Sequence, residues 1–274
     1  MKPAPFRYAR PDSVEEAVRL LASDEDAKAL SGGQSLIPMM NFRLARPSLL
    51  VDVGAIPELR ELRREGGQLV IGAAVRQRVA ERSPLVREAC PLVAQALRWV
   101  GHPQIRARGT VGGSLAHADP ASELCALLVA LDGEVVAVGP DGARTIPAAE
   151  LFFAPYMTSL EEAELLTQVR LPTLDGARSA FREIARRSGD FAIAGACAVA
   201  QADGQVRLAG LGVGGTVLRL SGAEAVLRDG GSIAAAGDAA AAECDPSSDL
   251  HADADTRRAA LKATVEQALT EVMA

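Results

Sequence analysis

The sequence of 274 residues predicts an α+β protein made of three successive units. A helix start at 11–16 and short apolar runs at 27–30 and 49–53 favour a βαβ-like first unit. In the second unit, the turn residues Gly139–Gly142 lie between two apolar runs and predict a β-hairpin. In the third unit, extended runs precede helical ones, which is typical of helices packed against one face of an antiparallel sheet. We therefore expect units at 1–56, 57–175 and 176–274.

Capping and breaking residues define the elements of the first unit. Ser13 and Glu16 have the spacing of a capping box and predict an N-terminal helix. Pro38 interrupts the apolar segment 36–44, and Pro47 ends it, because the residue before a proline is disfavoured in the helical region. The sequence thus predicts strands at 27–30 and 49–53 around a short helical or turn-like segment.

Strands and helices alternate through the second unit, and strands precede helices in the third. Asp119 and Pro120 predict the start of a helix that continues over 124–131, with the acid near the N-cap and the proline in the first turn. The other elements expected in the second unit are strands at 69–71, 134–138, 143–146 and 165–171 and helices at 74–82 and 85–100. Those expected in the third unit are strands at 179–185, 192–200 and 205–212 and helices at 223–227, 233–242 and 256–273.

Composition and charge limit the classes of function. Hydrophobic residues form 49% of the chain and charged residues 23%, which is typical of a soluble globular protein with a substantial core. The net charge of −6 and the lack of a basic stripe argue against a nucleic-acid partner. No apolar run reaches the length of a membrane span, and the N-terminus has no signal-peptide core. We therefore expect a cytoplasmic protein without a membrane span.

Cysteine and histidine spacing gives no sign of a metal site. The cysteines are Cys90, Cys125, Cys197 and Cys244, and the histidines are His102, His117 and His251. Most of the cysteines lie among small apolar residues, where a cysteine usually fills space in a core. The histidines lack a ligand spacing such as HExxH. We therefore expect no metal in this chain, and a reducing compartment is the simplest one for cysteines that fill a core.

Two glycine-containing segments favour a phosphate site. Ser31–Leu36 and Thr110–Ser114 each combine paired glycines with hydroxyl side chains and lead toward a helix. Adjacent glycines let a backbone approach a bulky anion, and successive amide groups form a concave anion site. Each segment alone is an ordinary turn, but together they favour a site for the phosphates of one dinucleotide. Lys28, on the strand before the first segment, either supports a phosphate or is a solvated lysine.

Several other residues can be interpreted either as structural or as functional. Gly210–Gly215 matches the GxGxxG fingerprint, but the extended segment 216–220 follows where that fingerprint requires a helix, so we interpret it as a turn between strands. His117 either contacts a ligand or bonds to the backbone. Ser31 and Ser35 have no nearby base and are not assigned as nucleophiles. The arginines interpreted as surface charges are Arg106, Arg108, Arg186 and Arg187.

Two long motifs resemble the FAD-binding medium subunit of molybdenum hydroxylases. That family includes the medium subunit of carbon monoxide dehydrogenase and the flavin domain of xanthine dehydrogenase. The first motif is GGQSLIP at 32–38, and the second is RGTVGGSLAHADP at 108–120. The likeness extends to RRSGDFA at 186–192 and, near the end, to Asp245, Pro246, Arg257 and Arg258. Because both long motifs occur in the family's order and spacing, the resemblance is specific.

The resemblance implies a fold and a set of cofactor contacts. The fold has two α/β FAD-binding subdomains of the vanillyl-alcohol-oxidase type, followed by an α+β C-terminal domain with an antiparallel sheet. By position, Ser31–Leu36 and Thr110–Ser114 would hold the pyrophosphate and ribityl region, and Leu166 and Phe191 would lie beside the isoalloxazine ring, on which an aromatic side chain can stack. The complete set of candidate FAD-binding residues is Lys28, Ser31, Gly32, Gly33, Gln34, Ser35, Leu36, Thr110, Gly112, Gly113, Ser114, His117, Glu123, Leu166, Arg182 and Phe191.

One position departs from the family pattern. Family members often carry a lysine soon after the aromatic residue that corresponds to Phe181, and here Arg182 and Glu183 occupy that place. Which residue contacts the polar edge of the flavin ring therefore stays open.

The function implied by the resemblance is electron transfer. The chain would be the FAD subunit of a molybdenum hydroxylase complex, accepting electrons from iron–sulfur clusters and passing them to an external acceptor. The molybdenum cofactor would lie in a large partner subunit and the 2Fe–2S clusters in a small one, with a dimer of heterotrimers as one arrangement. Alternatives are a self-contained FAD oxidase or dehydrogenase of the same fold and a nucleotide-binding regulatory module. No catalytic residue is assigned, and the sequence names neither substrate nor terminal acceptor.

Overall fold

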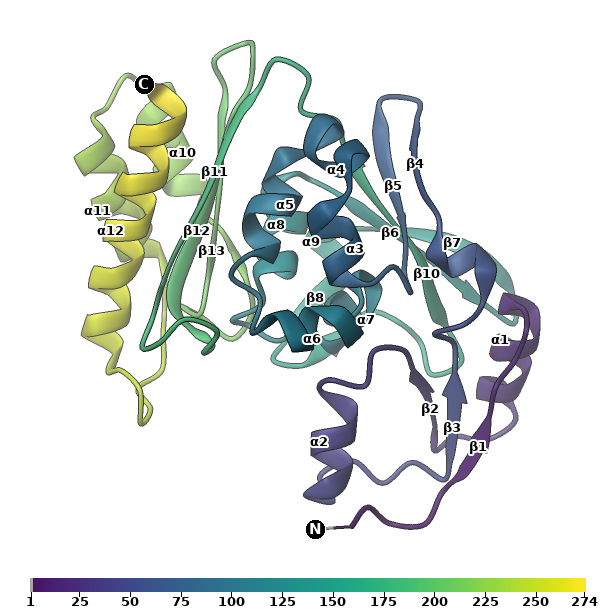
Figure 1. Cartoon of the computed structure of the whole chain (residues 1–274). Coiled ribbons are helices and arrows are strands. Elements are labelled where there is room, and N and C mark those ends of the chain that lie inside the picture. Colours follow the sequence, from purple (N-terminus) through teal and green to yellow (C-terminus); the bar gives the residue numbers. More distant parts are fainter. Residues whose placement is uncertain (1) are drawn as a thin grey trace.

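The computed structural model describes residues 2–274, and its N-terminal sheet is parallel. The strands are β1 (Arg7–Ala9), β2 (Ala27–Leu30) and β3 (Leu49–Asp52), in the order β1–β3–β2. Helices α1 (Val14–Ala22) and α2 (Leu36–Asn41) lie on opposite sides of this sheet (Figure 1). The Ser13 side chain caps α1 by accepting a hydrogen bond from the Glu16 amide at 3.2 Å, which confirms the predicted helix start. The Glu16 carboxylate accepts from the Asp12 amide at 3.2 Å instead of from the Ser13 amide, as the full capping box would require.

A five-stranded antiparallel sheet follows, with the strand order β4–β5–β10–β6–β7. Its strands are β4 (Leu62–Glu65), β5 (Gln68–Gly72), β6 (Glu134–Gly139), β7 (Gly142–Pro147) and β10 (Leu165–Pro172). Strands β6 and β7 form the expected hairpin, whereas β1 and β4 were not expected, because both are short and largely polar. The 3₁₀ helix η1 (Pro57–Arg60) precedes the sheet, and β8 (Phe152–Ala154) pairs with β9 (Met157–Thr158).

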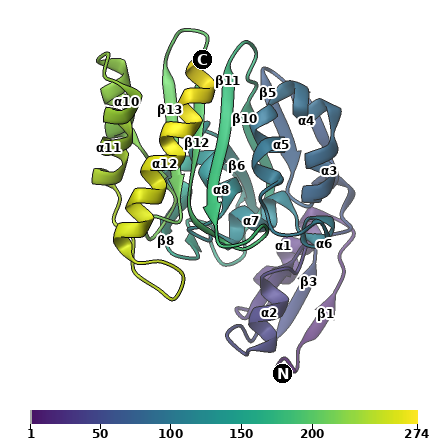
Figure 2. The same ribbon diagram turned by 60° about the vertical axis from the view of Figure 1, so that its left-hand side comes forward.

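Short helices connect the strands of the central sheet. They are α3 (Gln77–Arg82), α4 (Pro84–Ala89), α5 (Pro91–Leu97), α6 (Pro103–Arg108), α7 (Val111–His117), α8 (Glu123–Ala130) and α9 (Ala148–Leu151). The single helix expected at 85–100 is two helices, because Pro91 has no amide hydrogen to continue α4 and instead begins α5. Helices α4, α5 and α8 lie between the central sheet and the C-terminal sheet (Figures 1 and 2).

The helix expected from Asp119 begins later in the chain. Ser122 is the N-cap of α8, and its hydroxyl accepts a hydrogen bond from the Cys125 amide at 3.4 Å. The Asp119 carboxylate instead accepts from the Ala121 amide at 2.9 Å and stabilises the turn between α7 and α8. This turn places Glu123 at the buried start of α8.

The C-terminal sheet is antiparallel and is covered by helices on its outer face (Figure 2). Its strands are β11 (Arg178–Ala185), β12 (Ala192–Ala200), β13 (Val206–Leu211) and β14 (Leu218–Arg219), and the helices are α10 (Ser221–Arg228), α11 (Ile233–Glu243) and α12 (Ala254–Met273). Strand β12 is buried on both faces: Cys197 and Val199 join the core on the α8 side, and alternating alanines join the core under the outer helices. The predicted succession of strands and then helices is confirmed.

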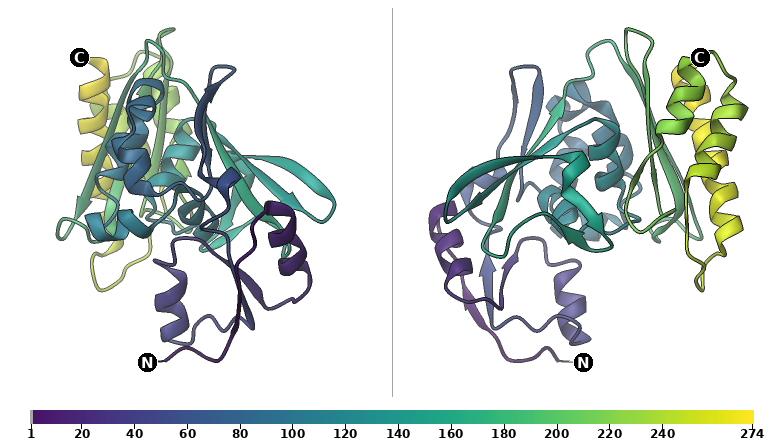
Figure 3. Two further views of the ribbon diagram at one scale, coloured as in Figure 1. Left: turned by 45° about the vertical axis from the view of Figure 1, so that its right-hand side comes forward. Right: turned by 180° about the vertical axis from the view of Figure 1, so that it is seen from behind.

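The N-terminal sheet lies at the end of the molecule opposite the C-terminal helices (Figure 3). It has its own core cluster, which includes Val51, Ile56 and Leu59. Among residues 2–274, no helix combines the length and the apolar character that crossing a membrane requires.

Candidate functional site

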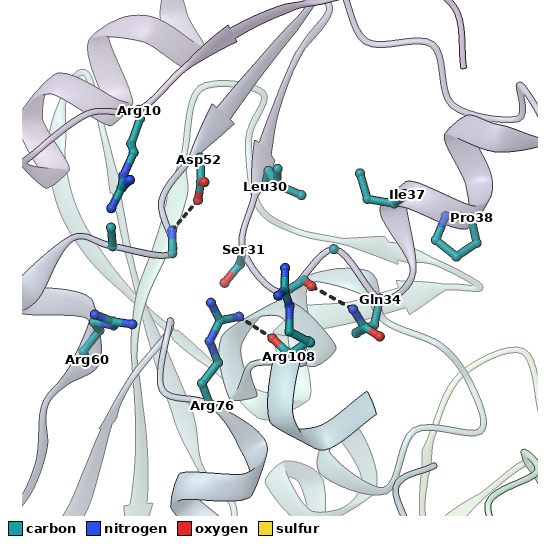
Figure 4. A pocket seen from close by; sticks show the side chains of 14 residues that line it. Arg10, Leu30, Ser31, Gln34, Ile37, Pro38, Asp52, Arg60, Arg76 and Arg108 are labelled. Carbon is teal, nitrogen blue, oxygen red and sulfur yellow. Dashed lines mark hydrogen bonds between the residues drawn. The ribbon is translucent and has the colours of Figure 1, made fainter. Parts of the chain in front are cut away.

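A cavity of about 770 Å³ lies where the N-terminal sheet meets the central unit (Figure 4). The loop from Ser31 to Gln34, which links β2 to α2, forms one wall, and the loop after β3 with Asp52 and Gly54 forms another. These loops follow the carboxyl ends of parallel strands, which is where open α/β sheets bind ligands. The residues that line the cavity are Arg10, Leu30, Ser31, Gly32, Gly33, Gln34, Ile37, Pro38, Asp52, Gly54, Ala55, Arg60, Arg76 and Arg108.

Four arginines give the cavity a positive charge. Arg10, Arg60, Arg76 and Arg108 all line it, while Asp52 is the one acidic residue among the described lining. Asp52 is itself engaged, because it accepts hydrogen bonds from the Tyr8 hydroxyl at 2.6 Å and from the Gly54 amide at 2.9 Å. Burial, and then the charges of Arg60 and Arg108, lower the pKa of Arg76. The electrostatics of the cavity therefore favour an anionic ligand.

The structure brings the two glycine segments together at this cavity. The hydroxyl groups of Ser31 and Thr110 are hydrogen-bonded at 2.9 Å. A Cβ on Gly32 would lie 2.6 Å from the carbonyl oxygen of Arg108, so only glycine lets the first segment pack so closely against the second. Arg76 donates a hydrogen bond to that same carbonyl (Figure 4).

The glycines have different roles from those expected. Gly33 has a φ of +71°, in the left-handed region that favours glycine. Gly112 faces Ala73, whose Cβ would lie 2.5 Å from an added Cβ, so it allows α7 to pack closely against the chain after β5. Gly113 lies in the first turn of α7, where its amide donates to the capping Thr110 hydroxyl at 3.2 Å. The second segment is thus the start of a helix rather than an open turn.

The first segment retains free hydrogen-bond donors. Within residues 2–274, the backbone amides of Gly32, Gly33, Gln34 and Ser35 donate to no protein acceptor. A run of such amides beside arginines matches the oxygen-rich diphosphate of a dinucleotide. The residues present therefore fit the diphosphate portion of FAD.

Several of the other candidate residues continue away from this cavity along α7 and α8. The hydroxyl groups of Ser114 and Ser122 are hydrogen-bonded at 3.0 Å, and Glu123 follows directly. Burial raises the pKa of Glu123 to about 7. The His117 ring lies 5.2 Å from the Tyr156 ring, centroid to centroid, and burial lowers the pKa of His117.

A second cavity, also of about 770 Å³, lies beside the C-terminal sheet. Phe191 lines it together with Asp119, Tyr156 and Arg186, and the Phe191 ring is 76% exposed. Asp119, Pro120 and Ala121, in the turn between α7 and α8, line this second cavity, whereas Arg108, before α7, lines the first. Of the candidate FAD-binding residues, Ser31, Gly32, Gly33 and Gln34 therefore line the first cavity, and Phe191 lines the second.

Some candidate residues are not brought to either cavity. Lys28 is exposed on β2. Leu166 lies on β10 opposite Ala137 of β6 and is buried in the core, with 4% of its surface exposed. Arg182 points toward α12, where it pairs with Glu271. Ser35 is the N-cap residue of α2, and Leu36 is the first residue of that helix; neither lines a cavity.

Arginines were the residues that sequence reasoning missed. Arg10, Arg60 and Arg76 carried no local motif, and Arg108 was interpreted as a surface charge although it lines the cavity. Arg106, also interpreted as a surface charge, is 6% exposed and donates to the Glu81 carboxylate at 2.9 Å. For Arg108 the available signal was its place as the first residue of the second motif, and for Arg10, Arg60 and Arg76 the sequence offered none.

These features define a protein that binds the diphosphate of a nucleotide cofactor. The chain belongs to the family of FAD-binding medium subunits of molybdopterin dehydrogenases. Residues 4–174 match the model of the FAD binding domain in molybdopterin dehydrogenase, and residues 179–272 match the CO dehydrogenase flavoprotein C-terminal domain. Proteins of this family are the FAD subunits of multi-subunit molybdenum hydroxylases, which are oxidoreductases.

Relatives of known function match over their full length. The chain is 42% identical to the alpha subunit of the 6-hydroxypseudooxynicotine dehydrogenase complex of Paenarthrobacter nicotinovorans, covering 100% of this chain and 96% of the relative. It is 40% identical to the carbon monoxide dehydrogenase medium chain of Hydrogenophaga pseudoflava, with 100% and 99% covered. A solved structure of carbon monoxide dehydrogenase from the latter organism superposes with a TM-score of 0.95 at 41% identity, covering 100% of this chain and 99% of that one.

Proposed function

We propose that this chain carries electrons through FAD, from iron–sulfur clusters of a partner subunit to an external acceptor. The observation that carries the proposal is the arginine-lined cavity at the free amides of Gly32–Ser35, in a chain of the FAD-binding family. FAD, when bound, supplies the redox chemistry, while the protein supplies binding, orientation and electrostatics. Partners are a molybdenum-cofactor large subunit and an iron–sulfur small subunit, and we propose a cytoplasmic complex.

The candidate residues are proposed to hold FAD in an extended arrangement. Ser31–Gln34 and the arginines bind the diphosphate, and Thr110 orients Ser31 through their hydrogen bond. Gly113, Ser114 and His117, on α7, contact the part of FAD between the diphosphate and the ring. Phe191, in the second cavity, lies beside the isoalloxazine ring. Units 1–56 and 57–175 supply the phosphate end, and unit 176–274 supplies Phe191.

The relatives favour a subunit over a self-contained enzyme. Those compared above are named as a complex subunit and a medium chain, and this chain spans 96% and 99% of their lengths. The names of these two relatives specify different compounds, 6-hydroxypseudooxynicotine and carbon monoxide. The chain is nearly equally identical to both, at 42% and 40%. Substrate choice is therefore assigned to another subunit, and the substrate of this complex is open.

Binding of FAD to the full chain tests the proposal. Flavin is removed at low pH and high salt, and FAD is then titrated while its fluorescence is followed. We expect saturable binding at a ratio of one FAD per chain, with ADP competing for the same cavity because it carries the same diphosphate. A chain that binds neither FAD nor ADP would contradict the proposal.

A further inference from the structure

Phe191 lies on the loop between β11 and β12, and its ring faces the second cavity. The ring is exposed there, whereas Ala192, the first residue of β12, is buried in the core. A side chain that few neighbours pack against takes its position from the backbone that carries it. The contacts that hold this loop therefore decide where the Phe191 ring lies.

Arg257, on α12, binds the backbone just after Phe191. Helix α12 lies across the outer face of β11 and β12 (Figure 2), but the Arg257 side chain lines the second cavity. Its Nη1 atom donates to the carbonyl oxygen of Ile193 at 2.6 Å and to that of Gly212 at 2.9 Å. Ile193 is the second residue of β12, and Gly212 directly follows β13. One guanidinium group thus joins the beginning of β12 to the end of β13.

Gly212 connects this guanidinium to the turn between α7 and α8. It has a φ of +74°, and a Cβ added to it would lie 2.8 Å from the carbonyl oxygen of Ile193. Only glycine therefore lets the two carbonyl groups approach the same Nη1 atom. The Gly212 amide donates to the carbonyl oxygen of Pro120 at 2.9 Å. The contacts of Arg257 thus relate the Phe191 loop to the helices that carry the other proposed FAD contacts.

The Arg257 guanidinium is itself held in one orientation. Arg257 is 8% exposed, and its Nη2 atom donates to the Asp249 carboxylate at 2.7 Å. The other oxygen of that carboxylate accepts from the amides of His251 at 2.7 Å and Ala252 at 3.1 Å. These two amides lower the pKa of Asp249, so it stays a charged partner for Arg257. Hydrogen bonds from a planar guanidinium to a carboxylate are strong and directional.

The part of the loop before Phe191 has weaker contacts. Arg186 is hydrogen-bonded to Nδ1 of His251 at 3.0 Å, and both side chains are exposed. Gly189, with a φ of +90°, lies against the exposed ring of His102, which would be 2.5 Å from an added Cβ. Contacts between exposed side chains compete with water and add little. The buried Arg257 is therefore the main polar anchor of the loop.

We propose that Arg257 is a positioning residue that fixes the Phe191 loop, and with it the aromatic side of the flavin site. The inference rests on the proposed function, in which Phe191 lies beside the isoalloxazine ring. Aromatic rings stack favourably only in particular arrangements, so a shift of the loop backbone weakens the stack. The diphosphate stays bound in the arginine-lined cavity, because Arg257 does not line that cavity. Arg257 thus acts on the cofactor through Phe191.

A double-mutant cycle in the full chain tests this assignment, with Arg257→Gln, Phe191→Ala and the double variant. We expect each single substitution to raise the dissociation constant for FAD by roughly 2- to 12-fold, which corresponds to one aromatic stack. The double variant should equal Phe191→Ala alone, because Arg257 acts through Phe191. The midpoint potential of the bound flavin should follow the same pattern, which a merely structural role of Arg257 would not produce.

ADP binding and a neighbouring arginine are the controls. ADP should bind every variant with wild-type affinity, because it lacks the flavin ring, and its binding also shows that a variant is folded. Arg258→Gln is the matched substitution, since Arg258 pairs with Asp255 on the surface of α12 and does not line the second cavity. Its FAD affinity and flavin potential should equal those of the wild type.

Asp249→Asn decides the question if Arg257→Gln does not fold. The exposed Asp249 keeps an oxygen for the two loop amides in this variant, while the oxygen that accepts from Arg257 becomes an amide group. We expect a smaller shift of the same sign, which disappears in the Phe191→Ala background. Shifts that persist in full without Phe191, or wild-type affinity and potential in the folded variants, would overturn the assignment. Failure of the wild type to bind FAD would instead overturn the proposed function.

Discussion

Arg76 lies beside Arg60 and Arg108 at the arginine-lined cavity. Burial and the charges of Arg60 and Arg108 lower its pKa, so a bound diphosphate would stabilise its guanidinium. For Arg76→Gln we expect FAD affinity to fall roughly 10- to 150-fold, the loss of one hydrogen bond between charged groups. Titrations at increasing salt should show a weaker salt dependence for the variant, because less charge is left to screen.

A matched control for Arg76→Gln is Arg228→Gln, whose side chain is 73% exposed at the end of α10. Its FAD affinity should equal that of the wild type. Unchanged FAD binding in Arg76→Gln would show that the arginine serves only to hold the Arg108 carbonyl.

The raised pKa of the buried Glu183 makes the stability of the flavin-free chain depend on pH. Its pKa is raised from 4.5 to about 9, so the folded chain keeps a proton that the unfolded chain releases. The free energy of unfolding therefore falls as pH rises between about pH 5 and 9, by up to about 1.4 kcal/mol per pH unit for one proton. Carboxyl groups with lowered pKa, such as Glu81, act below this range.

Thermal unfolding of wild type and Glu183→Gln across this pH range is the measurement. The melting temperature of the variant should fall less than that of the wild type as the pH rises, because the substituted amide does not titrate. Parallel curves for the two proteins would mean that Glu183 ionises freely in the folded chain.

At the residue scale, sequence reasoning found what has a local signal. Ser31–Gln34 was recognised because paired glycines and hydroxyls lie in one short segment. Arg10, Arg60 and Arg76 were missed, because they come together only when the N-terminal sheet forms and Arg76 pairs with Thr110 across a β-bridge. Gly112 was assigned to phosphate approach, but its lack of a Cβ serves packing against Ala73.

At the element scale, the start of α7 is held against the Ser31–Gln34 wall of the arginine-lined cavity. The Thr110 hydroxyl caps the helix and bonds to Ser31. A Cβ on Gly113 would lie 2.6 Å from that hydroxyl oxygen, so Gly113→Val must displace it. We expect the variant to purify without flavin and to lose roughly 1–3 kcal/mol of unfolding free energy, as overpacking usually costs.

Thr110→Ser is the control for Gly113→Val, because it retains the hydroxyl. Flavin absorbance per chain and far-ultraviolet circular dichroism separate loss of binding from loss of fold, and the C-terminal sheet should remain folded in both variants. Full flavin content in Gly113→Val would mean that the Ser31–Thr110 contact has no part in binding.

Helix boundaries show where element prediction from sequence is limited. The cap at Ser13 was predictable, because its donor and acceptor are only three residues apart in the sequence. For α8, Asp119 and Ser122 are both good capping residues, and only the buried packing of the helix selects Ser122. Pro91 divides the segment 85–100 into two helices, and a proline pattern in a sequence does not distinguish such a break from a kink.

At the scale of the whole molecule, the packing of α8 against the C-terminal sheet could not be predicted from the sequence. Glu123 and Glu183 are far apart in the chain, and the family resemblance named Glu123 as a candidate and Glu183 as a departure without indicating that the two lie close together. Their proximity depends on β12 and β13 packing against α8 and on β11 packing against α5, which places these elements in one core cluster. The succession of sheets, in contrast, follows from turn residues and strand periodicity, which are local.

The isolated chain should bind FAD without iron, molybdenum or acid-labile sulfide. An iron–sulfur cluster is usually held by four cysteine thiolates brought together. Here Cys125 lies on α8, Cys244 follows α11, and only Cys90 and Cys197 are close enough for their charges to interact. Burial raises the pKa of Cys90 and of Cys125 to about 12, so these thiols stay protonated and are poor ligands.

The same chain should not reduce its flavin with candidate hydroxylation substrates, because the site has positioning residues and arginines but no assigned acid–base pair. Metal analysis and anaerobic mixing of the purified holoprotein with each substrate measure both expectations, and flavin bleaching is the readout. Addition of the molybdenum and iron–sulfur subunits should then restore substrate-dependent bleaching, since electrons would reach FAD through the clusters. Bleaching of the lone chain by substrate, or stoichiometric iron in it, would make the self-contained flavoenzyme the correct interpretation.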